Sequence, residues 1–158
     1  MKKFLHFKKK GILSFFYFIF LISTPLLLAK TPSDLYLTSS SVQNNPFFVM
    51  ASRNKGNKAF REKIEIAYLI EVVRRSSLSF IRNGETHSAS EAAAHLLWKY
   101  LQAGGRVKTT HDFIDGIASQ SIQTGSRYWV KIPSGKTYLL RDVLYNELQR
   151  LEQSLKEK

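Results

Sequence analysis

The stretch of sequence that decides the fold reads Phe80-Ile81-Arg82-Asn83-Gly84-Glu85-Thr86-His87 and runs on into Ser88-Ala89-Ser90-Glu91. Asn-Gly is the commonest tight-turn dipeptide, because both residues tolerate a positive φ. Ser88 and Glu91 have the spacing of a capping box, which predicts the start of a helix. We expect that helix to reach about Ala103, because Gly104-Gly105 follows. The stretch therefore predicts a turn between two helices, and it carries more functional groups than a turn requires.

Apolar periodicity and turn signals predict the elements on either side. Helices are expected over 58–77, from Thr109 through the apolar positions up to Ala118, and over 141–156. Two short apolar runs flank the turn formed by residues 133–136, which predicts a β-hairpin. The expected fold class is mainly α: a small domain of about four helices with one β-hairpin before the C-terminal helix.

The N-terminus predicts export. Residues 1–10 carry five lysines and no acid, and the 19 residues of 11–29 are mostly apolar. This pattern is typical of a signal peptide, and we expect cleavage after Ala29. An uncleaved anchor is the alternative, since about 20 apolar residues span a bilayer. The rest of the chain would then be periplasmic or secreted, or anchored at the inner membrane with the domain in the periplasm.

The remaining chain divides into two parts. Residues 30–57 are rich in Ser, Asn, Thr and Pro and lack helical periodicity, so we expect a flexible linker whose short apolar pieces could dock on the domain. Residues 58–158 are expected to form a single globular helical domain, because about 100 residues can bury one modest core. The chain has no Cys, which excludes disulfides and a lipid-modified cysteine.

The charge favours anionic partners. Lys and Arg number 24 and Asp and Glu number 12, but five of the basic residues lie in residues 1–10, so the exported part has 19 − 12 = +7. An envelope location argues against nucleic acid. An acidic protein surface, a wall polymer or lipid headgroups fit better, although solubility alone also explains the charge. Contact with the membrane is expected only through an uncleaved N-terminal segment.

Six polar and aromatic residues form the candidate binding surface: Arg82, Asn83, His87, His95, Trp98 and Lys99. Arg82 could clamp a carboxylate or phosphate with its planar fork, or it could pair with a carboxylate or with helix-terminal carbonyls as a structural residue. Glu91, His95 and Lys99 form an i, i+4, i+8 row, which predicts a weakly ion-paired stripe at the edge of the apolar face. Trp98 is either an exposed contact for a partner or is covered by another element.

The sequence offers little for metal or catalytic chemistry. His87 and His95 are eight residues apart, whereas helical metal ligands are usually four apart, and His111 would join them only if the fold brought it close. We expect no metal and no cofactor. A Ser-His-Asp set can be drawn from Ser119 or Ser121 with Asp112, but the chain has no Gly-x-Ser-x-Gly elbow.

The spacing of several motifs resembles that of a family of small exported bacterial proteins catalogued only as a domain of unknown function. The motifs are Phe80-Ile81-Arg82-Asn83-Gly84, Ala92-Ala93 with His95-Leu96 and Lys99, the segment 110–121, and then Gly125 and Tyr128. The resemblance covers about Ile64 to Leu148. It implies a shared fold and an envelope location, but no activity. Members often carry a Cys just before the Phe-Ile-Arg-Asn-Gly run, where this chain has Leu78.

We therefore expect a non-enzymatic envelope protein, an accessory or binding module that contacts protein or wall components. The alternative is a small periplasmic hydrolase that uses His87 or His95 as general base. An enzyme requires Arg82, the two histidines and Asp112 to converge on one pocket, with nucleophile and base within hydrogen-bond reach. A binding module requires only a surface patch.

Overall fold

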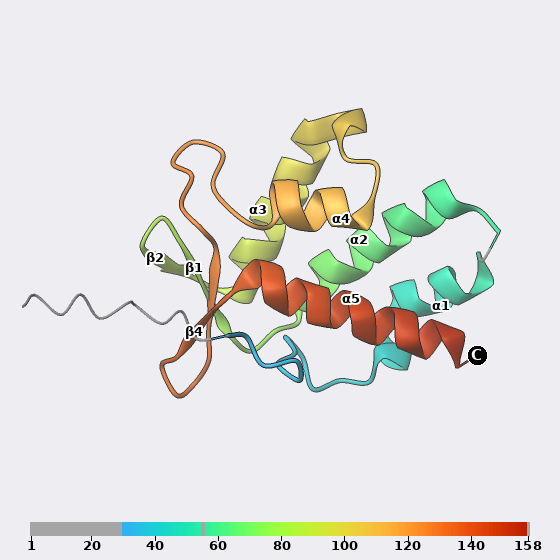
Figure 1. Ribbon diagram of the computed structural model, residues 1–158, viewed down its shortest axis with the longest axis horizontal. Helices are drawn as coiled ribbons and strands as arrows, with labels where there is room; N and C mark the ends of the chain where they lie inside the picture. The colour runs from blue at the N-terminus through green and yellow to red at the C-terminus, as the bar shows by residue number, and fades with distance from the viewer. Residues whose placement is uncertain (1–29, 55, 158) are drawn as a thin grey trace, which may run out of the picture.

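The computed structural model describes residues 30–54 and 56–157, so the expected signal peptide or anchor lies outside the described residues. A four-stranded sheet occupies one end of the molecule and the long helices occupy the other (Figure 1). The elements in chain order are η1 (Val42–Asn44), α1 (Pro46–Arg53), α2 (Lys58–Arg74), β1 (Ser79–Arg82), β2 (Glu85–His87), α3 (Ala89–Ala103), η2 (Gly104–Arg106), α4 (Thr110–Asp112), the π-helical turn η3 (Phe113–Ile117), β3 (Trp129–Lys131), β4 (Thr137–Leu139) and α5 (Leu140–Lys156).

The sheet is antiparallel, with strand order β2-β1-β3-β4. The expected hairpin before the C-terminal helix is confirmed as β3–β4. A second hairpin, β1–β2, was missed, because the decisive stretch is not a turn between two helices. Its turn residues Asn83 and Gly84 have φ values of 51° and 83°, which suits a two-residue hairpin turn. Strands of four and three residues are too short to show a clear alternation of apolar and polar side chains.

The helices expected over 58–77, 88–103 and 141–156 are present as α2, α3 and α5, so the protein is mainly helical as expected. The expected set of about four helices is not correct in detail: the helix from Thr109 to Ala118 is the short α4 followed by the π-helical turn η3, and α1 was not predicted.

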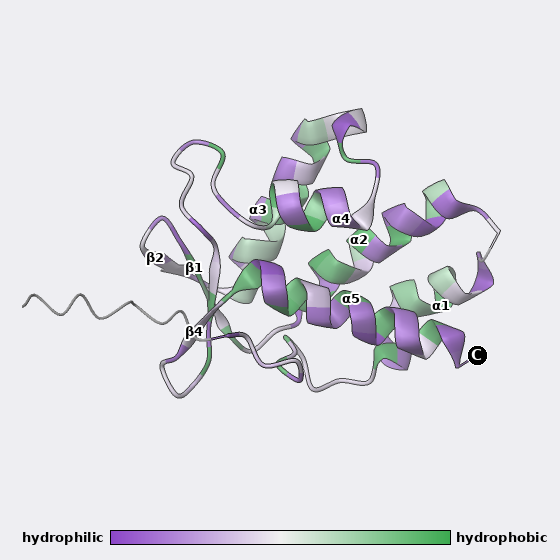
Figure 2. Ribbon diagram, in the orientation of Figure 1, coloured by the Kyte–Doolittle hydropathy of each residue, from purple (hydrophilic) through white to green (hydrophobic). Residues whose placement is uncertain are grey.

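The capping box of α3 is complete: Ser88 Oγ accepts from the Glu91 amide at 3.3 Å, and Glu91 Oε2 accepts from the Ser88 amide at 2.8 Å. Green and purple bands alternate along α5 in Figure 2, as expected of a helix with one buried face. That face contributes Val143, Leu144 and Leu148 to the core.

The structure differs most from expectation over residues 30–57, where we predicted a flexible linker. Asn45 caps α1 by accepting from the Phe47 amide at 3.0 Å, and Pro46 occupies the first turn. Leu37 and Phe48 are each only 1% exposed and lie in the main core. The prediction failed because these apolar residues form only short runs in a polar segment, and their burial depends on helices that come later in the chain.

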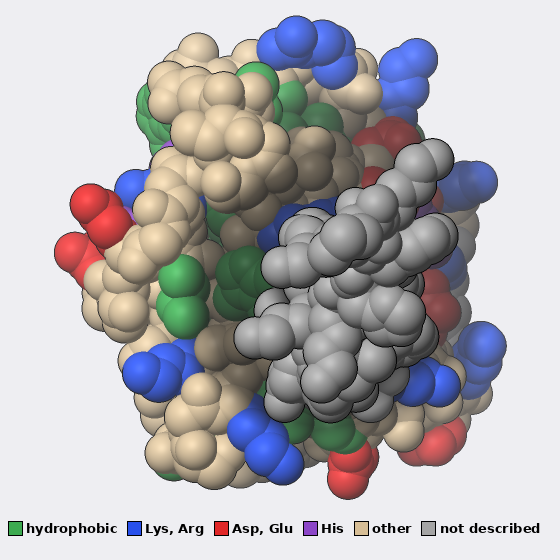
Figure 3. All heavy atoms as spheres, turned by 60° about the vertical axis from the view of Figure 1, so that its left-hand side comes forward, with side chains coloured by type: hydrophobic (Ala, Val, Ile, Leu, Met, Phe, Trp, Pro, Cys, Tyr) green, Lys and Arg blue, Asp and Glu red, His purple; other side chains and the backbone are tan. Residues whose placement is uncertain are grey.

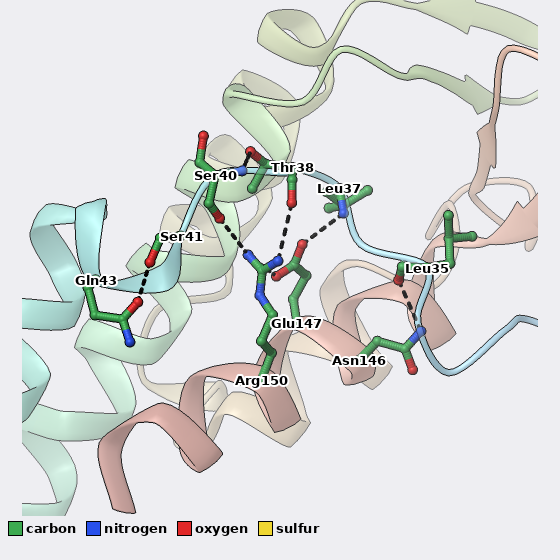
Figure 4. Close-up of polar contacts among 9 residues, drawn as sticks. All are labelled: Leu35, Leu37, Thr38, Ser40, Ser41, Gln43, Asn146, Glu147 and Arg150. Atoms are coloured by element: carbon green, nitrogen blue, oxygen red, sulfur yellow. Dashed lines mark hydrogen bonds and ion pairs between the residues drawn. The ribbon is translucent and has the colours of Figure 1, made fainter. Parts of the chain in front are cut away.

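Polar side chains of α5 hold this N-terminal segment in place (Figure 4). Glu147 is fully buried; it accepts from the Leu37 amide at 2.8 Å and pairs with Arg150 at 3.2 Å. Arg150 also donates to the carbonyls of Thr38 and Ser40. Asn146 donates to the carbonyl oxygens of Pro32 and Leu35, at 2.8 and 3.1 Å. The segment is therefore part of the folded unit.

Among residues 30–54 and 56–157, no helix combines the length and the hydrophobicity that a membrane span requires.

Candidate functional site

A cleft of about 430 Å³ lies between the β1–β2 turn, α3 and the loop that leads to β3. Its volume falls within the usual range of small-ligand sites. The cleft is lined by Arg82, Asn83, His95, Trp98, Lys99, Ser121, Ile122, Gln123 and Tyr128. Five of the six predicted surface residues therefore come together. The sixth, His87, lines a smaller cavity of about 20 Å³ that shares Arg82, His95 and Tyr128 with the cleft.

One wall of the cleft is a side of α3, and the opposite wall is formed by the β1–β2 turn and the loop before β3. His95, Trp98 and Lys99 follow the i, i+3, i+4 spacing that places side chains on one side of a helix. Across from them, Thr124 Oγ1 donates to Asn83 Oδ1 at 2.8 Å. This bond ties the loop before β3 to the β1–β2 turn, although the two residues are 41 positions apart.

Lys99 forms the floor of the cleft and is only 4% exposed, so the expected ion-paired stripe at the helix edge is wrong for this residue. Its ammonium group donates to the carbonyls of Ile117 and Gln120, the latter at 2.8 Å, and to the Tyr128 hydroxyl at 3.4 Å. Burial lowers the pKa of Lys99 to about 8, and the nearby Arg82 acts in the same direction. Lys99 caps the carbonyl end of the η3 turn, where a cation is favourable.

His95 is held between two aromatic side chains. Its ring stacks on Trp98 with centroids 5.9 Å apart, and its Nε2 lies 3.3 Å from the Tyr128 hydroxyl. Burial, together with the charges of Arg82, Lys99 and His87, lowers the pKa of His95 to about 4. Because the Tyr128 hydroxyl accepts from Lys99, its own proton is available to Nε2. We therefore assign a neutral His95 whose Nε2 accepts this hydrogen bond.

Arg82 is half-buried at the end of β1, and its side chain makes no hydrogen bond or ion pair with any described residue. The expected pairing with a carboxylate or with helix carbonyls is therefore absent. Among the residues that the structure describes, no Asp or Glu lines the cleft. A guanidinium group has five donors in a planar fork, so the cleft presents positive charge and unused donors to whatever enters it.

The positive charge of the cleft is carried by recessed side chains. On the face drawn in Figure 3, outside the part that grey atoms cover, Lys and Arg side chains lie at several separate places, most of them near the outline. The positive charge of the cleft comes from two residues recessed within it: Arg82, which is half-buried, and Lys99, which is buried. Recessed charges have less contact with solvent ions and are screened less than exposed ones.

His87 lies at the end of β2, opposite Phe80 in the sheet. Its Nε2 is buried and has no hydrogen-bond partner among the described residues. The side chain lines the smaller cavity rather than the cleft. It is therefore a neighbour of the candidate site, not one of its walls.

The residues drawn into a Ser-His-Asp set do not assemble. Asp112 caps α4, accepting from the amides of Lys108 and Thr109 at 3.0 and 2.9 Å. It lines a different cavity, together with His111. Ser121 lines the cleft, but within the described residues it forms no hydrogen bond to a histidine.

His111 packs against Tyr145, with ring centroids 5.6 Å apart, and does not line the cavities that contain His87 and His95. In the part of the chain that the structure describes, no three His, Asp or Glu side chains are grouped so that they could hold a metal ion.

Comparison with known proteins places the chain in a family. Residues 60–152 match the family of unknown function DUF5329, and the chain belongs to that family. An uncharacterized protein of Salmonella typhimurium, YfeK, is 42% identical over 62 residues, which are 39% of this chain and 52% of the relative. The chain thus spans about half the length of the curated relative it matches. No solved structure matches it.

Sequence reasoning missed the loop side of the site. Tyr128, Ser121, Ile122 and Gln123 were not among the predicted surface residues, yet all four line the cleft. Tyr128 contacts His95 across 33 positions of sequence, and no local pattern reports such a contact. Its place in the spaced motifs of the family resemblance is the one signal that could have drawn attention to it.

Proposed function

We propose that this protein is a non-enzymatic accessory or binding module of the bacterial envelope, and that it holds an acidic group of a protein or wall component in the cleft. One observation carries the proposal: the half-buried side chain of Arg82 has no partner among the described residues, none of which brings a carboxylate to the cleft. A carboxylate or phosphate would accept two parallel hydrogen bonds from such a guanidinium group.

The other residues of the cleft support the same reading. Lys99 adds a second positive charge from the floor, and Asn83 and Gln123 offer amide groups at the sides. Trp98, which is 58% exposed, offers an aromatic surface at the edge. A few convergent polar groups beside an apolar wall are the usual composition of a binding site.

The hydrolase alternative has weaker support. His95 already uses its Nε2 in the contact with the Tyr128 hydroxyl, and no other described hydroxyl and no described carboxylate hydrogen-bonds to its ring. The buried Nε2 of His87 is likewise without such a partner.

Titration with small anions, followed by ¹⁵N NMR, tests the proposal. Sodium acetate and inorganic phosphate would each be added to protein purified from the cell envelope, at constant ionic strength. We expect saturable shifts at the amides around Arg82, Trp98 and Tyr128 with at least one anion. Arg82→Gln should abolish these shifts, whereas Lys136→Gln should not, because Lys136 is an exposed lysine in the β3–β4 turn. Equal shifts in all three proteins would refute the cleft as an anion site.

The envelope role requires a separate experiment. Wild type and Arg82→Ala would be crosslinked in intact cells and recovered by pull-down, with Lys136→Ala as the control for loss of charge. We expect one or more envelope components to be recovered with wild type and with the control, but not with Arg82→Ala. Recovery with all three would show that the contact does not use the cleft.

A further inference from the structure

Resting on the proposed function, we propose that the cleft and the exposed apolar side of α3 together dock an amphipathic polypeptide segment of a partner protein. The segment inserts one internal Asp or Glu side chain into the cleft against Arg82. Its apolar side chains pack on both sides of that acid, along Leu97, Trp98 and Leu101.

The first observation is an apolar stripe on α3 that no described element covers. Leu97, Trp98 and Leu101 are 44%, 58% and 66% exposed, and Ala94 is exposed as well. Their spacing places them along one side of the helix. Ile122, which is 77% exposed, also lines the cleft with Trp98. Contiguous exposed apolar side chains beside a polar cleft are typical of an interaction site.

The second observation is the position of the cleft relative to the stripe. Trp98 belongs to both, and the stripe continues about one helical turn to either side of it, to Ala94 and to Leu101. A ligand whose acid enters beside Trp98 therefore has apolar surface available in both directions. An acidic side chain within a segment uses both directions, whereas the carboxylate at a chain end uses only one.

The third observation favours a polypeptide over a membrane surface. A lipid surface presents a plane of headgroups. A protein that binds such a surface exposes cationic side chains around an apolar patch, where they can contact the headgroups. Here Lys99 is 4% exposed, and Arg82 is half-buried. Arg106, in η2 just after α3, turns its guanidinium to the carbonyls of Gln102 and Ala103. Recessed charge suits a single projecting acid.

The acid at the beginning of the stripe does not oppose this arrangement. Glu91 lies one turn before His95, and its carboxylate accepts from both the amide and the hydroxyl of Ser88 in the capping box. These hydrogen bonds lower the pKa of Glu91 and hold its charge at the start of α3.

Fluorescence anisotropy with matched peptides tests this proposal. The probe is a labelled amphipathic peptide of about twelve residues, built from Ala, Leu and Lys with one central Glu, beside the same peptide with a central Gln. Protein purified from the cell envelope should bind the Glu peptide at least about tenfold more tightly, which corresponds to about 1.4 kcal/mol. Trp98→Ala and Arg82→Gln should each weaken binding of the Glu peptide by a similar factor.

Two control variants separate specific loss from general damage. Phe60→Ala removes a 40%-exposed aromatic residue on α2, and Lys136→Gln removes an exposed charge from the β3–β4 turn. Both should bind the Glu peptide as wild type does. Circular dichroism of each variant confirms that it is folded before its affinity is compared.

Each unfavourable outcome has a distinct meaning. Equal affinity for the Glu and Gln peptides would overturn the insertion of an acid. Loss of binding in Arg82→Gln with full binding in Trp98→Ala would overturn docking along α3 and leave the anion site standing. If no peptide binds, and vesicles of phosphatidylglycerol and phosphatidylcholine bind through Trp98, the apolar stripe is a membrane contact. If acetate and phosphate also fail to bind in the NMR titration, the proposed function itself fails.

Discussion

At the scale of single residues, the contacts of the Arg82 side chain could not be read from its sequence pattern. The sequence places it before a tight turn and leaves open whether its side chain has a structural partner or binds a ligand. The turn is present, but no described carboxylate or carbonyl meets the guanidinium group. The backbone of Arg82 thus serves the hairpin, while its side chain remains available to a ligand.

Replacing Arg82 should therefore cost little stability. We expect Arg82→Ala to lower the free energy of unfolding by less than about 1 kcal/mol, because it leaves no buried partner unsatisfied. Arg150→Ala is the matched comparison, since Arg150 pairs with buried Glu147 and donates to two carbonyls. Arg150→Ala should lose several times more free energy of unfolding than Arg82→Ala. Chemical denaturation measures both, and a loss of 1–3 kcal/mol in Arg82→Ala would reveal a structural partner.

His95 should make the protein sensitive to acid. Its pKa in the folded protein is lowered to about 4 from 6.5, chiefly by burial. The unfolded chain therefore binds more protons between these values, and stability is lost as the pH falls from about 6.5 towards 4. His95→Gln should lose less stability than wild type between about pH 7 and about pH 5.

Urea denaturation at the two pH values measures this difference. Burial raises the pKa values of Glu65 and Glu147, and these groups act in the opposite direction as the pH falls. Subtracting the result for His95→Gln from that for wild type removes their contribution. Parallel losses in the two proteins would show that His95 titrates normally.

At the scale of elements, Lys99 links α3 to the end of the η3 turn. Lys99→Met keeps most of the side-chain volume but leaves the carbonyls of Ile117 and Gln120 without this donor. We expect a loss of about 1–3 kcal/mol. Lys131→Met, on the exposed face of β3, should change stability little. If both variants have the stability of wild type, water satisfies these carbonyls as well as Lys99 does.

The contact between α5 and the N-terminal segment depends on Glu147. Glu147→Ala removes the acceptor of the Leu37 amide and leaves Arg150 without its buried partner. We expect a loss of about 3–5 kcal/mol, the usual cost of breaking a buried pair on one side. Limited proteolysis should then cut within residues 31–41. The control is Gln149→Ala, because Gln149 is exposed on the same helix, and this variant should remain resistant to the protease. If Glu147→Ala is also resistant, the burial of apolar side chains alone holds the segment.

For the whole molecule, the structure changes where the folding unit begins. A protein that starts at Lys58 lacks the buried side chains of Leu37, Val42 and Phe48. Burying each side chain stabilises the fold by about 1.5–3 kcal/mol, so the three together contribute about 5–9 kcal/mol. The whole free energy of unfolding of a typical domain is about 5–15 kcal/mol. We expect this truncated protein to lose its cooperative thermal transition, whereas one that starts at Lys30 should retain it. A cooperative transition in the shorter protein would restore the boundary expected from sequence.

Two parts of the fold illustrate what a sequence pattern can predict. The helix that begins at Ser88 was predicted because its capping box and its apolar periodicity are contained within a few neighbouring residues. The β1–β2 hairpin was missed, although Asn83-Gly84 correctly indicated a tight turn. What flanks a tight turn depends on strand pairing, and β1 pairs with β3, about 50 residues later in the chain.

By itself, the sequence determined the residues of interest and the local elements that carry them: a turn after Arg82, and a helix with His95, Trp98 and Lys99 on one side. Only the tertiary structure decided which of them are recessed, which are charged and which are paired. The Tyr128 hydroxyl reaches His95 and Lys99 across 33 and 29 positions of sequence. Burial and protonation depend on such distant neighbours, because the environment that packs around an ionisable group sets its pKa.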